Sequence, residues 1–416
     1  MTDIQKENKS GGKVPNLRFP SFEGEWEVKK LGEVATNFMY GMNAAATVYD
    51  GENQYIRITD IDERTRLFTP NPLSSPDGEL EDKYLLEKGD ILFARTGASV
   101  GKSYLYSEKD GKIFFAGFLI RLNVKTENPY FIFSQTLTEK YQKWVLTMSM
   151  RSGQPGINAE EYKLLSIVIP SIQEQEKISS FLLLIDERIQ AQSKILIHLK
   201  SLIESLNDSL SEQKIRINSN FENWKKVRLG DLGYTFTGLS GKTKEDFGNG
   251  KRYIQYKQIF DSSKIVIENC GYVNVSENEN QNSVKYGDIF FTISSETPDE
   301  IGMSSVLLED VKNVYLNSFC FGFRLNSFNE MLPEFARFLF RSKVVRNEIK
   351  KLAQGSTRYN MSKTELLKLE VLLPSIKEQK EISAFLSSLD QKIQTEKTIL
   401  EQLEMQKKYL LQQMFV

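Results

Sequence analysis

The 416-residue sequence is poor in the side chains on which many catalytic and metal sites depend. Its single histidine, His198, excludes HExxH zinc sites and two-histidine iron sites. A serine or cysteine nucleophile with a histidine base would have to use this one residue, which we interpret as a surface residue of a helix. The two cysteines, Cys270 and Cys320, form no CxxC pair, so we expect reduced thiols in a cytoplasmic protein.

Long hydrophobic runs and an excess of one charge are also missing. No apolar stretch approaches the length of a membrane span, and residues 1–16 form a polar arm without the apolar core of a signal peptide. We therefore expect no contact with a membrane. The 54 basic and 55 acidic side chains give a net charge of −1. This balance argues against binding nucleic acid by bulk charge alone, although local basic patches remain open.

What the sequence does contain is an internal duplication. The stretch PSIQEQEKISSFL, beginning at Pro170, recurs 204 residues later as PSIKEQKEISAFL, beginning at Pro374. Upstream the offset is 198, so that Trp26 matches Trp224, and Gly89-Asp90-Ile91 matches 287–289. The change in offset is what loops of different length on a shared frame would produce.

Each copy predicts a mostly strand-forming α+β domain followed by a long helix. The expected strands are rich in β-branched and aromatic residues between turn residues: 54–58, 91–94, 113–122, 253–258, 289–293 and 314–325. Helical segments over 129–148 and 332–352 and last strands over 166–169 and 369–373 follow. The predicted order is an arm over 1–16, a first domain over 17–170, a helix over 171–216, a second domain over 217–374 and a helix over 375–416.

Both long helices begin with a predicted capping box, Ser171-x-x-Glu174 and Ser375-x-x-Glu378. From there apolar residues recur in steps of four and three, which is the heptad pattern of a coiled coil. Two matching stripes in one chain favour an antiparallel pair whose heptad region spans roughly 48 Å. The polar interruptions Gln192 and Glu396 occupy the same repeat position and are candidates for fixing the register.

Three motifs come close to catalytic signatures without meeting them. Thr96–Ser103 resembles a phosphate-binding loop but has threonine at the first glycine and no βαβ surroundings. Pro76-Asp77 with Glu81-x-Lys83 has too short a gap for a nuclease motif, and Asn128-Pro129-Tyr130 lacks the second proline of an adenine-methyltransferase box. The sequence therefore predicts no catalytic constellation.

In their order and duplication, these landmarks resemble the specificity subunit of Type I restriction-modification systems, from about residue 17 to the C-terminus. The resemblance is carried by 26–33 (WEVKKLGE), 55–61 (YIRITDI), 89–102 (GDILFARTGASVGK), 238–244 (GLSGKTK), 355–360 (GSTRYN) and the paired PSIxEQ helix starts. The first domain departs from the second at the place equivalent to 238–244, where it reads Tyr40-Gly41-Met42-Asn43.

The resemblance implies two target-recognition domains, each of which reads one half of a split double-stranded DNA sequence in the major groove. It also implies that the two helices separate these domains with approximate twofold symmetry and bind two copies of the modification (methyltransferase) subunit. Adenine methylation and ATP-driven cleavage then belong to modification and restriction subunits, which would bind S-adenosylmethionine, ATP and magnesium. This chain would be non-catalytic and would hold no cofactor or metal.

The candidate DNA-binding residues are side chains suited to base edges or phosphates. Amides suited to base edges are Gln154, Asn158, Gln255, Gln258 and Asn360, and the arginines, which suit guanine or phosphate, are Arg57, Arg95, Arg151 and Arg358. Lysines suited to phosphate are Lys102, Lys242, Lys244, Lys257 and Lys363, and hydroxyl-bearing candidates are Thr59, Thr96, Ser99, Ser240, Ser294 and Tyr359.

A run of basic residues in the second domain has two interpretations. Arg337, Arg341, Lys343, Arg346, Lys350 and Lys351 suit either a DNA backbone or a solvated helix face. For the whole chain, the alternative to a DNA-specificity subunit is a coiled-coil scaffold that joins proteins. That alternative explains the helices but not the repeated loops with glycine, arginine and lysine. An enzyme ranks third.

Overall fold

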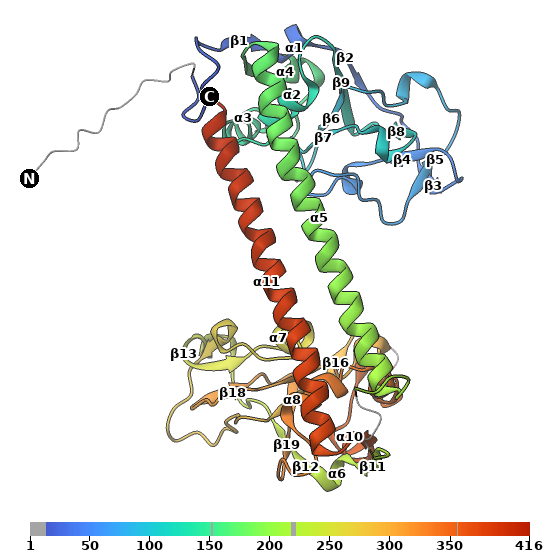
Figure 1. Ribbon diagram of the computed structural model, residues 1–416, viewed down its shortest axis with the longest axis vertical. Helices are drawn as coiled ribbons and strands as arrows, with labels where there is room; N and C mark the ends of the chain where they lie inside the picture. Colours follow the sequence, from blue (N-terminus) through green and yellow to red (C-terminus); the bar gives the residue numbers. More distant parts are fainter. Residues whose placement is uncertain (1–13, 151–152, 218–221, 356) are drawn as a thin grey trace, which may run out of the picture. The chain divides into compact units, whose positions relative to one another are not determined.

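The chain folds into two compact units, each built from parts that are distant in sequence. In the computed structural model, unit 1 consists of residues 1–193 and 399–416, and unit 2 consists of residues 194–398 (Figure 1). The structure describes residues 14–150, 153–217, 222–355 and 357–416. Unit 1 therefore contains the first globular domain with the start of the first long helix and the end of the second. Unit 2 contains the second globular domain with the end of the first long helix and the start of the second.

The globular part of unit 1 is built on a four-stranded antiparallel sheet. Its order is β2 (Ala35–Tyr40), β9 (Leu119–Val124), β6 (Asp90–Ala94) and β7 (Ser103–Leu105). Three two-stranded pairs accompany it: β1 (Glu27–Lys30) with β10 (Ser166–Ile169), β3 (Ala46–Val48) with β5 (Ser74–Pro76), and β4 (Gln54–Ile56) parallel to β8 (Ile113–Phe115). The helices are α1 (Leu31–Val34), α2 (Pro129–Gln135), α3 (Glu139–Ser149) and α4 (Ala159–Lys163).

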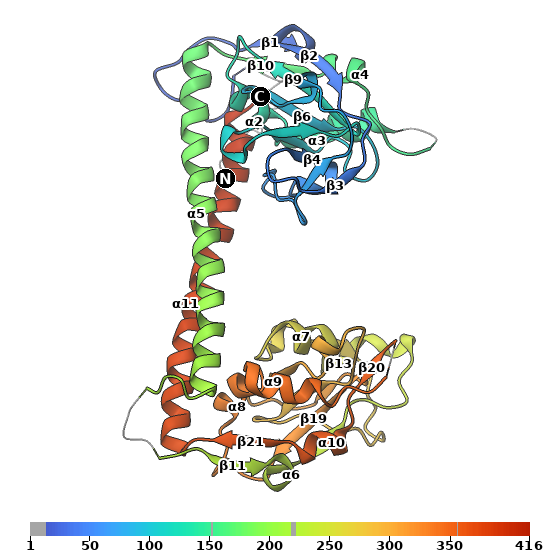
Figure 2. The same cartoon turned by 90° about the vertical axis from the view of Figure 1, so that its right-hand side faces the viewer.

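Unit 2 repeats the four-stranded sheet but differs in its smaller sheets. Its four-stranded sheet has the order β12 (Gly233–Thr237), β19 (Cys320–Leu325), β15 (Ile289–Thr292) and β17 (Ser304–Val306). The other strands are β13 (Phe247–Ile254) between β14 (Gly271–Val273) and β18 (Val314–Leu316), β16 (Ser294–Ser295) with β20 (Tyr359–Asn360), and β11 (Lys225–Arg228) with β21 (Glu370–Leu373). The helices are α6 (Leu229–Leu232), α7 (Tyr256–Asp261), α8 (Pro333–Leu339), α9 (Lys343–Lys350) and α10 (Lys363–Lys368). Figure 2 shows β11 and β21 together beside the start of the last long helix.

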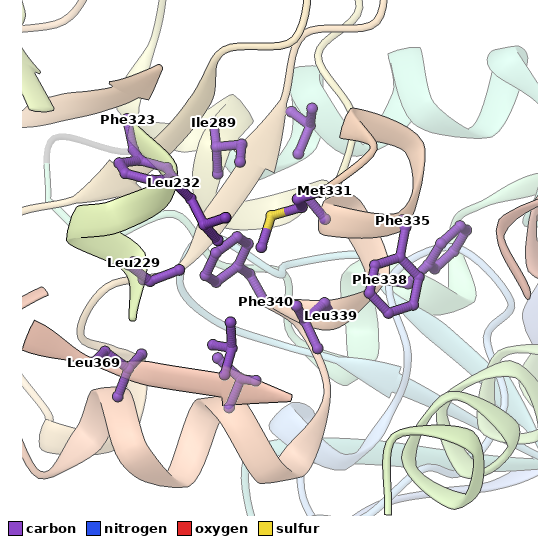
Figure 3. Packing of buried hydrophobic residues seen from close by; sticks show 14 of the residues in the cluster. Leu229, Leu232, Ile289, Phe323, Met331, Phe335, Phe338, Leu339, Phe340 and Leu369 are labelled. Carbon is purple, nitrogen blue, oxygen red and sulfur yellow. The ribbon is translucent and has the colours of Figure 1, made fainter. Parts of the chain in front are cut away.

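The core of unit 2 joins its sheet, its short helices and its long helices in one hydrophobic cluster. Figure 3 shows Ile289 and Phe323 of the sheet, Phe335 and Phe340 of the α8 region, and Leu369 packed together. The same cluster contains Leu210, Ile382 and Leu386 from the long helices. Removal of this apolar surface from water is the main force that holds the helices to the domain.

The two long helices are α5 (Ile172–Ser211) and α11 (Ile376–Met414). Unit 1 holds the start of α5 and the end of α11, where the Lys407 ammonium lies 2.5 Å from the Asp186 carboxylate. Unit 2 holds the end of α5 and the start of α11, so the helices are antiparallel in each unit (Figures 1 and 2). Most of the predicted heptad residues are buried, including Ile178, Leu182, Ile185, Ile189, Leu196, Leu210, Ile382, Leu386, Ile393, Leu400, Leu403, Leu410 and Met414. The single histidine, His198, is exposed on α5, as predicted.

The predicted capping boxes form only in part. The Ser171 hydroxyl accepts a hydrogen bond from the Glu174 N–H at 3.4 Å, as an N-cap does. The Glu174 carboxylate, however, is buried and is held by two hydrogen bonds of 2.8 Å from Arg18. In unit 2 the Arg216 guanidinium donates to Glu378 in the same way, at 3.1 and 2.8 Å. The glutamate of the motif therefore anchors the segment that leads into each domain.

The glutamine of the PSIxEQ motif connects each long helix to the domain before it. Gln175 Nε2 donates to the Pro170 carbonyl at 3.0 Å, and its Oε1 accepts from the Asn128 N–H at 3.0 Å. Gln379 makes the equivalent bonds to Pro374 and to the Leu332 N–H, at 3.0 and 2.8 Å. Both glutamines are fully buried, so these bonds satisfy polar groups that would otherwise be costly to bury.

Several predicted element boundaries require correction. The strand predicted over 253–258 ends at residue 254, and helix α7 begins at Tyr256. The strands predicted over 113–122 and 314–325 are each two strands separated by a turn, and each predicted helical segment is two short helices. Short apolar runs do not distinguish a strand from a buried helix, which explains the error at α7. The final strand over 166–169 is confirmed.

Candidate nucleic-acid interface

Within each unit, the fold brings an equivalent pair of loops together. In unit 1, Thr96 pairs with Gly156 in an isolated antiparallel bridge. In unit 2 the equivalent residues, Ser294 and Asn360, pair in the short β16–β20 ladder. The offsets between these positions, 198 and 204, are those found from the sequence. The predicted residues at 95–96 and 154–158, and those at 294 and 358–360, thus lie in one place in each unit.

In unit 1 the paired loops at 95–96 and 154–158 have Arg95 at their centre. Its guanidinium carbon lies 4.8 Å from the ring centroid of Tyr40 and 5.9 Å from that of Phe118, which are cation–π distances. Its Nε is buried and has no hydrogen-bond partner among the described residues. The exposed Gln154 lies beside Gly97 at the rim. The cluster therefore offers an arginine in contact with two aromatic rings and an amide beside Gly97 of the same loop.

In unit 2 the same place is a cleft of about 520 Å³. It is lined by Tyr256, Lys257, Phe260, Asp261, Ser294, Ser295, Glu296, Glu300, Phe319 and Arg358. The Tyr256 and Phe260 rings are stacked at 6.2 Å, and the Tyr256 hydroxyl donates to the Ser294 carbonyl at 2.8 Å. The cleft combines aromatic walls, hydroxyl groups, carboxylates and the exposed Arg358. Such a set can contact base edges by both hydrogen bonds and apolar surface.

The ammonium groups of Lys102 and Lys242, predicted as phosphate contacts, are already engaged within their own domains. Lys102 is 5% exposed, and its ammonium donates to the carbonyls of Ile58 and Ile61 at 3.2 and 3.0 Å. The Lys242 ammonium lies 2.6 Å from the Glu279 carboxylate and holds the pKa of that carboxyl down at about 2. Both lysines stabilise loops of their own domain.

Three other candidates use their polar atoms within the domain. The Asn158 side chain caps α4 by accepting from the Glu161 N–H at 2.9 Å. Gln258 Nε2 donates to the Val266 carbonyl at 2.6 Å, and the Arg57 guanidinium is paired with Asp60 at 2.8 and 2.9 Å. These contacts reduce what the three side chains can offer to DNA, because each new bond would have to replace an existing one.

The remaining candidates lie in loops and in the short elements α7, β20 and α10. Thr59, Ser240, Lys244, Gln255 and Asn360 are exposed, and Tyr359 and Lys363 are half-buried. Ser99 donates to Glu63 at 3.1 Å, and Lys257 is exposed but lies 2.9 Å from the Asp261 carboxylate. Arg151 lies outside the described residues. For the exposed residues, contact with DNA stays a prediction.

Neither interpretation of the basic run over 337–351 is right for its arginines. Arg341 donates to the carbonyls of Ile259, Phe260, Ser262 and Ser304, and Arg346 donates to those of Asp299, Ile301 and Gly302. Arg337 is paired with Asp390 on α11. Burial lowers the pKa of Arg341 and of Arg346 to about 10. These three arginines therefore hold the sheet, the loops and α11 together.

The first domain differs in sequence from the second at residues 40–43, but its backbone hydrogen bonding there is equivalent. The Met42 N–H donates to the Phe115 carbonyl at 2.9 Å, as the Leu239 N–H does to Leu316 at 2.7 Å. A Cβ at Gly41 would lie 2.2 Å from the Phe115 carbonyl oxygen, and one at Gly238 would lie 2.1 Å from the Asn317 carbonyl oxygen. Glycine is required at both places because the two backbones approach so closely.

Residues at these places that were not among the sequence candidates include Tyr40, Phe118, Tyr256, Phe260, Glu296 and Phe319. Isolated aromatic and acidic residues in loops carry no signal of their own. Only the comparison of the two copies would have shown that Phe118 and Phe319 each precede the same strand of the sheet. Among the described residues, no group of three or more histidine, cysteine, aspartate or glutamate side chains is arranged to hold a metal ion.

Comparison with known proteins agrees with this architecture. The family model for the Type I restriction modification DNA specificity domain matches the chain twice, over residues 23–201 and 221–405. The chain therefore belongs to this family. Members are non-catalytic specificity subunits of Type I restriction-modification systems, and so is this chain.

Two similar relatives come from Methanocaldococcus jannaschii. The Type I restriction enzyme MjaVIII specificity subunit is 21% identical over 414 residues, which cover 95% of this chain and 92% of the relative. The putative Type I restriction enzyme MjaX specificity subunit is 24% identical over 413 residues, covering 93% and 92%. In both cases the similarity extends over nearly the whole of both chains.

Solved structures share the fold. The Type I restriction-modification S subunit from M. genitalium has a TM-score of 0.56 at 17% identity and covers 97% of this chain and 99% of that chain. A chain from a study of complex assembly and conformational transition in a Type I system has the same TM-score and identity, with coverage of 93% and 95%. Among the described residues, no helix is long and apolar enough to cross a membrane.

Proposed function

We propose that this chain reads DNA for a Type I restriction-modification complex, and that each unit reads one half of a bipartite target in the major groove. The observation that carries the proposal is the loop pair at 95–96 with 154–158, repeated at 293–294 with 358–360. The backbone pairing is the same in both units, whereas the side chains differ, as with Gln154 and Arg358. A shared frame with different side chains is what two half-sites of different sequence require.

We also propose that the outer faces of α5 and α11 bind two copies of the methyltransferase subunit. Large apolar side chains are exposed there in both units: Leu183, Leu184, Met405 and Tyr409 in unit 1, and Ile195, Ile197, Leu202 and Phe385 in unit 2. Exposed apolar residues on a helix that already buries one stripe favour a second helical partner. The helix pair would then set the number of unread base pairs between the half-sites.

The chemistry belongs to partner subunits in this proposal. S-adenosylmethionine would bind the modification subunits, and ATP and magnesium would bind the restriction subunits of the full complex. We place the chain in the cytoplasm, where its two free cysteines, both buried, would stay reduced.

Exchange of one recognition domain tests the proposal. Residues 26–165 are replaced by those of a relative, and the methylated sequence in a host that carries the gene and its modification subunit is determined by methylome sequencing. We expect one half of the target to change and the other half to remain. A change in both halves would contradict separate reading by the two units.

Size-exclusion chromatography distinguishes the scaffold alternative. The full-length chain is mixed with the modification subunit, with and without a duplex that contains the methylated sequence. We expect a larger complex when the duplex is present. A complex with the modification subunit that never retains the duplex would favour a protein scaffold.

A further inference from the structure

Each unit exposes one phenylalanine at the same position of its fold. Phe118 directly precedes β9 and is 62% exposed, and Phe319 directly precedes β19 and is 59% exposed. A phenylalanine in water gives up much of the stabilisation that burial of its ring would provide. One exposed ring is ordinary for a protein surface, but two at equivalent positions of a diverged duplication suggest a shared role.

The backbone holds both rings in place. The Phe118 carbonyl accepts a hydrogen bond from the Arg95 N–H at 3.1 Å, and the Phe319 carbonyl accepts one from the Ile293 N–H at 3.0 Å. The next residues turn back in the same way, because Leu119 N–H donates to Ala116 at 2.9 Å and Cys320 N–H donates to Asn317 at 3.1 Å. Each phenylalanine is thus fixed beside the loop pair that carries the candidate base-reading residues.

The residues around each ring indicate which kind of ligand would pack against it. Phe118 lies under the Arg95 guanidinium, and Phe319 lines the 520 Å³ cleft together with Arg358 and Ser294. An occupant must therefore offer apolar surface next to hydrogen-bond acceptors that suit an arginine. The edges of base pairs in the major groove offer both, through thymine methyl groups and the guanine O6 and N7 atoms.

We propose that Phe118 and Phe319 are the apolar contacts of the two units with the bases of their half-sites. Each ring packs against base edges in the groove, and the arginine beside it donates to neighbouring acceptors. The aromatic anchor excludes water from these polar contacts and so strengthens them. This inference rests on the proposed function, because it places the rings in the same DNA-reading site.

Selection from a duplex pool with a randomised central segment tests the inference. The full-length chain, in complex with the modification subunit of its host, is compared with complexes that contain Phe118→Ala or Phe319→Ala. We expect each variant to bind the duplex selected by the wild type about ten-fold more weakly. Base preference should weaken only in the half that the altered unit reads.

Two control variants separate this role from a structural one. Phe328→Ala removes another exposed ring, beyond the opposite end of β19, and should leave binding within about two-fold of the wild type. Phe319→Tyr keeps the ring and should retain the base preference. Thermal unfolding of each variant shows whether the domain is intact.

The outcomes distinguish a failure of the proposed function from a failure of the inference. If the wild-type complex selects no two-part sequence, the proposed function fails. If it selects one, and Phe319→Ala binds that duplex with unchanged affinity and preference, the inference fails while the proposed function stands. Normal DNA binding with loss of the modification subunit would mean that the rings contact protein.

Discussion

Basic side chains have two different roles at the residue scale, and burial separates them. Lys102 and Arg346 are enclosed, and backbone carbonyls receive their hydrogen bonds. Lys244 and Arg358 are exposed, and Arg358 lies in the loop pair that we propose to read DNA. A buried cation that satisfies several carbonyls contributes to stability, whereas an exposed one is available to a polyanion.

Lys102→Ala should lower the free energy of unfolding by about 1–3 kcal/mol, because it leaves the carbonyls of Ile58 and Ile61 without their donor. Urea unfolding of the full chain measures this change. Lys244→Ala removes an exposed lysine and should change stability by less than about 0.5 kcal/mol. Equal stability of the two variants would contradict the structural role of Lys102.

Lys242→Ala should raise the pKa of Glu279 from about 2 toward the ordinary glutamate range, since the ammonium beside it is the main cause of the low value. The lowered pKa means that this contact stabilises the fold above the ordinary glutamate pKa. The stabilisation is lost as the pH falls toward 2. Carboxyl NMR titration measures the shift, and Lys257→Ala, which removes a lysine paired elsewhere, should leave Glu279 unchanged.

Arg358→Ala should weaken DNA binding in a way that identifies its contact. If Arg358 reads a base, the loss is about 1–3 kcal/mol and preference relaxes at one position. If it binds phosphate, affinity falls evenly across sequences and the salt dependence decreases by about one charge. Titrations at several salt concentrations distinguish the two, and unchanged binding would remove Arg358 from the interface.

At the scale of elements, the PSIxEQ motif connects each long helix to its domain through a network of hydrogen bonds. Its serine caps the helix, its glutamate holds the arginine of the incoming segment, and its glutamine satisfies the end of the preceding loop. Two copies of this network explain why so short a motif recurs almost unchanged while the surrounding loops differ. The motif is structural and lies apart from the proposed DNA-reading loops.

Removing one partner of the Arg18–Glu174 ion pair should lower the stability of unit 1. Arg18→Ala leaves the Glu174 carboxylate buried without its cation and should destabilise unit 1 by about 3–5 kcal/mol. The double variant Arg18→Ala with Glu174→Gln should recover part of this loss, because no charge remains buried. Thermal unfolding of the three proteins checks the order, and a single variant as stable as the wild type would contradict it.

At the scale of the whole molecule, one chain provides two similar units because α5 and α11 each contribute to both. Under the proposed function, the length of the helix pair sets the gap in the target. Inserting seven residues after Ser201, with a matching insertion in α11, adds about 10 Å of helix and should lengthen the gap by about three base pairs. Methylome sequencing reads the gap, and an unchanged gap would contradict the spacing role.

The sequence alone determined the duplication, the α+β class, the heptad helices and the family. These features depend on local order and periodicity, which a linear pattern records. It also placed Arg95 and Gln154 in the first domain, and Ser294 and Arg358 in the second, among the candidate DNA-binding residues.

Only the tertiary structure decided which cations are free. Lys102, Lys242, Arg341 and Arg346 look no different from exposed basic residues in the sequence, because burial and carbonyl partners come from segments far away in the chain. The exposure of Phe118 and Phe319 was hidden for the same reason. Aromatic residues are usually buried, and only packing shows where they are not.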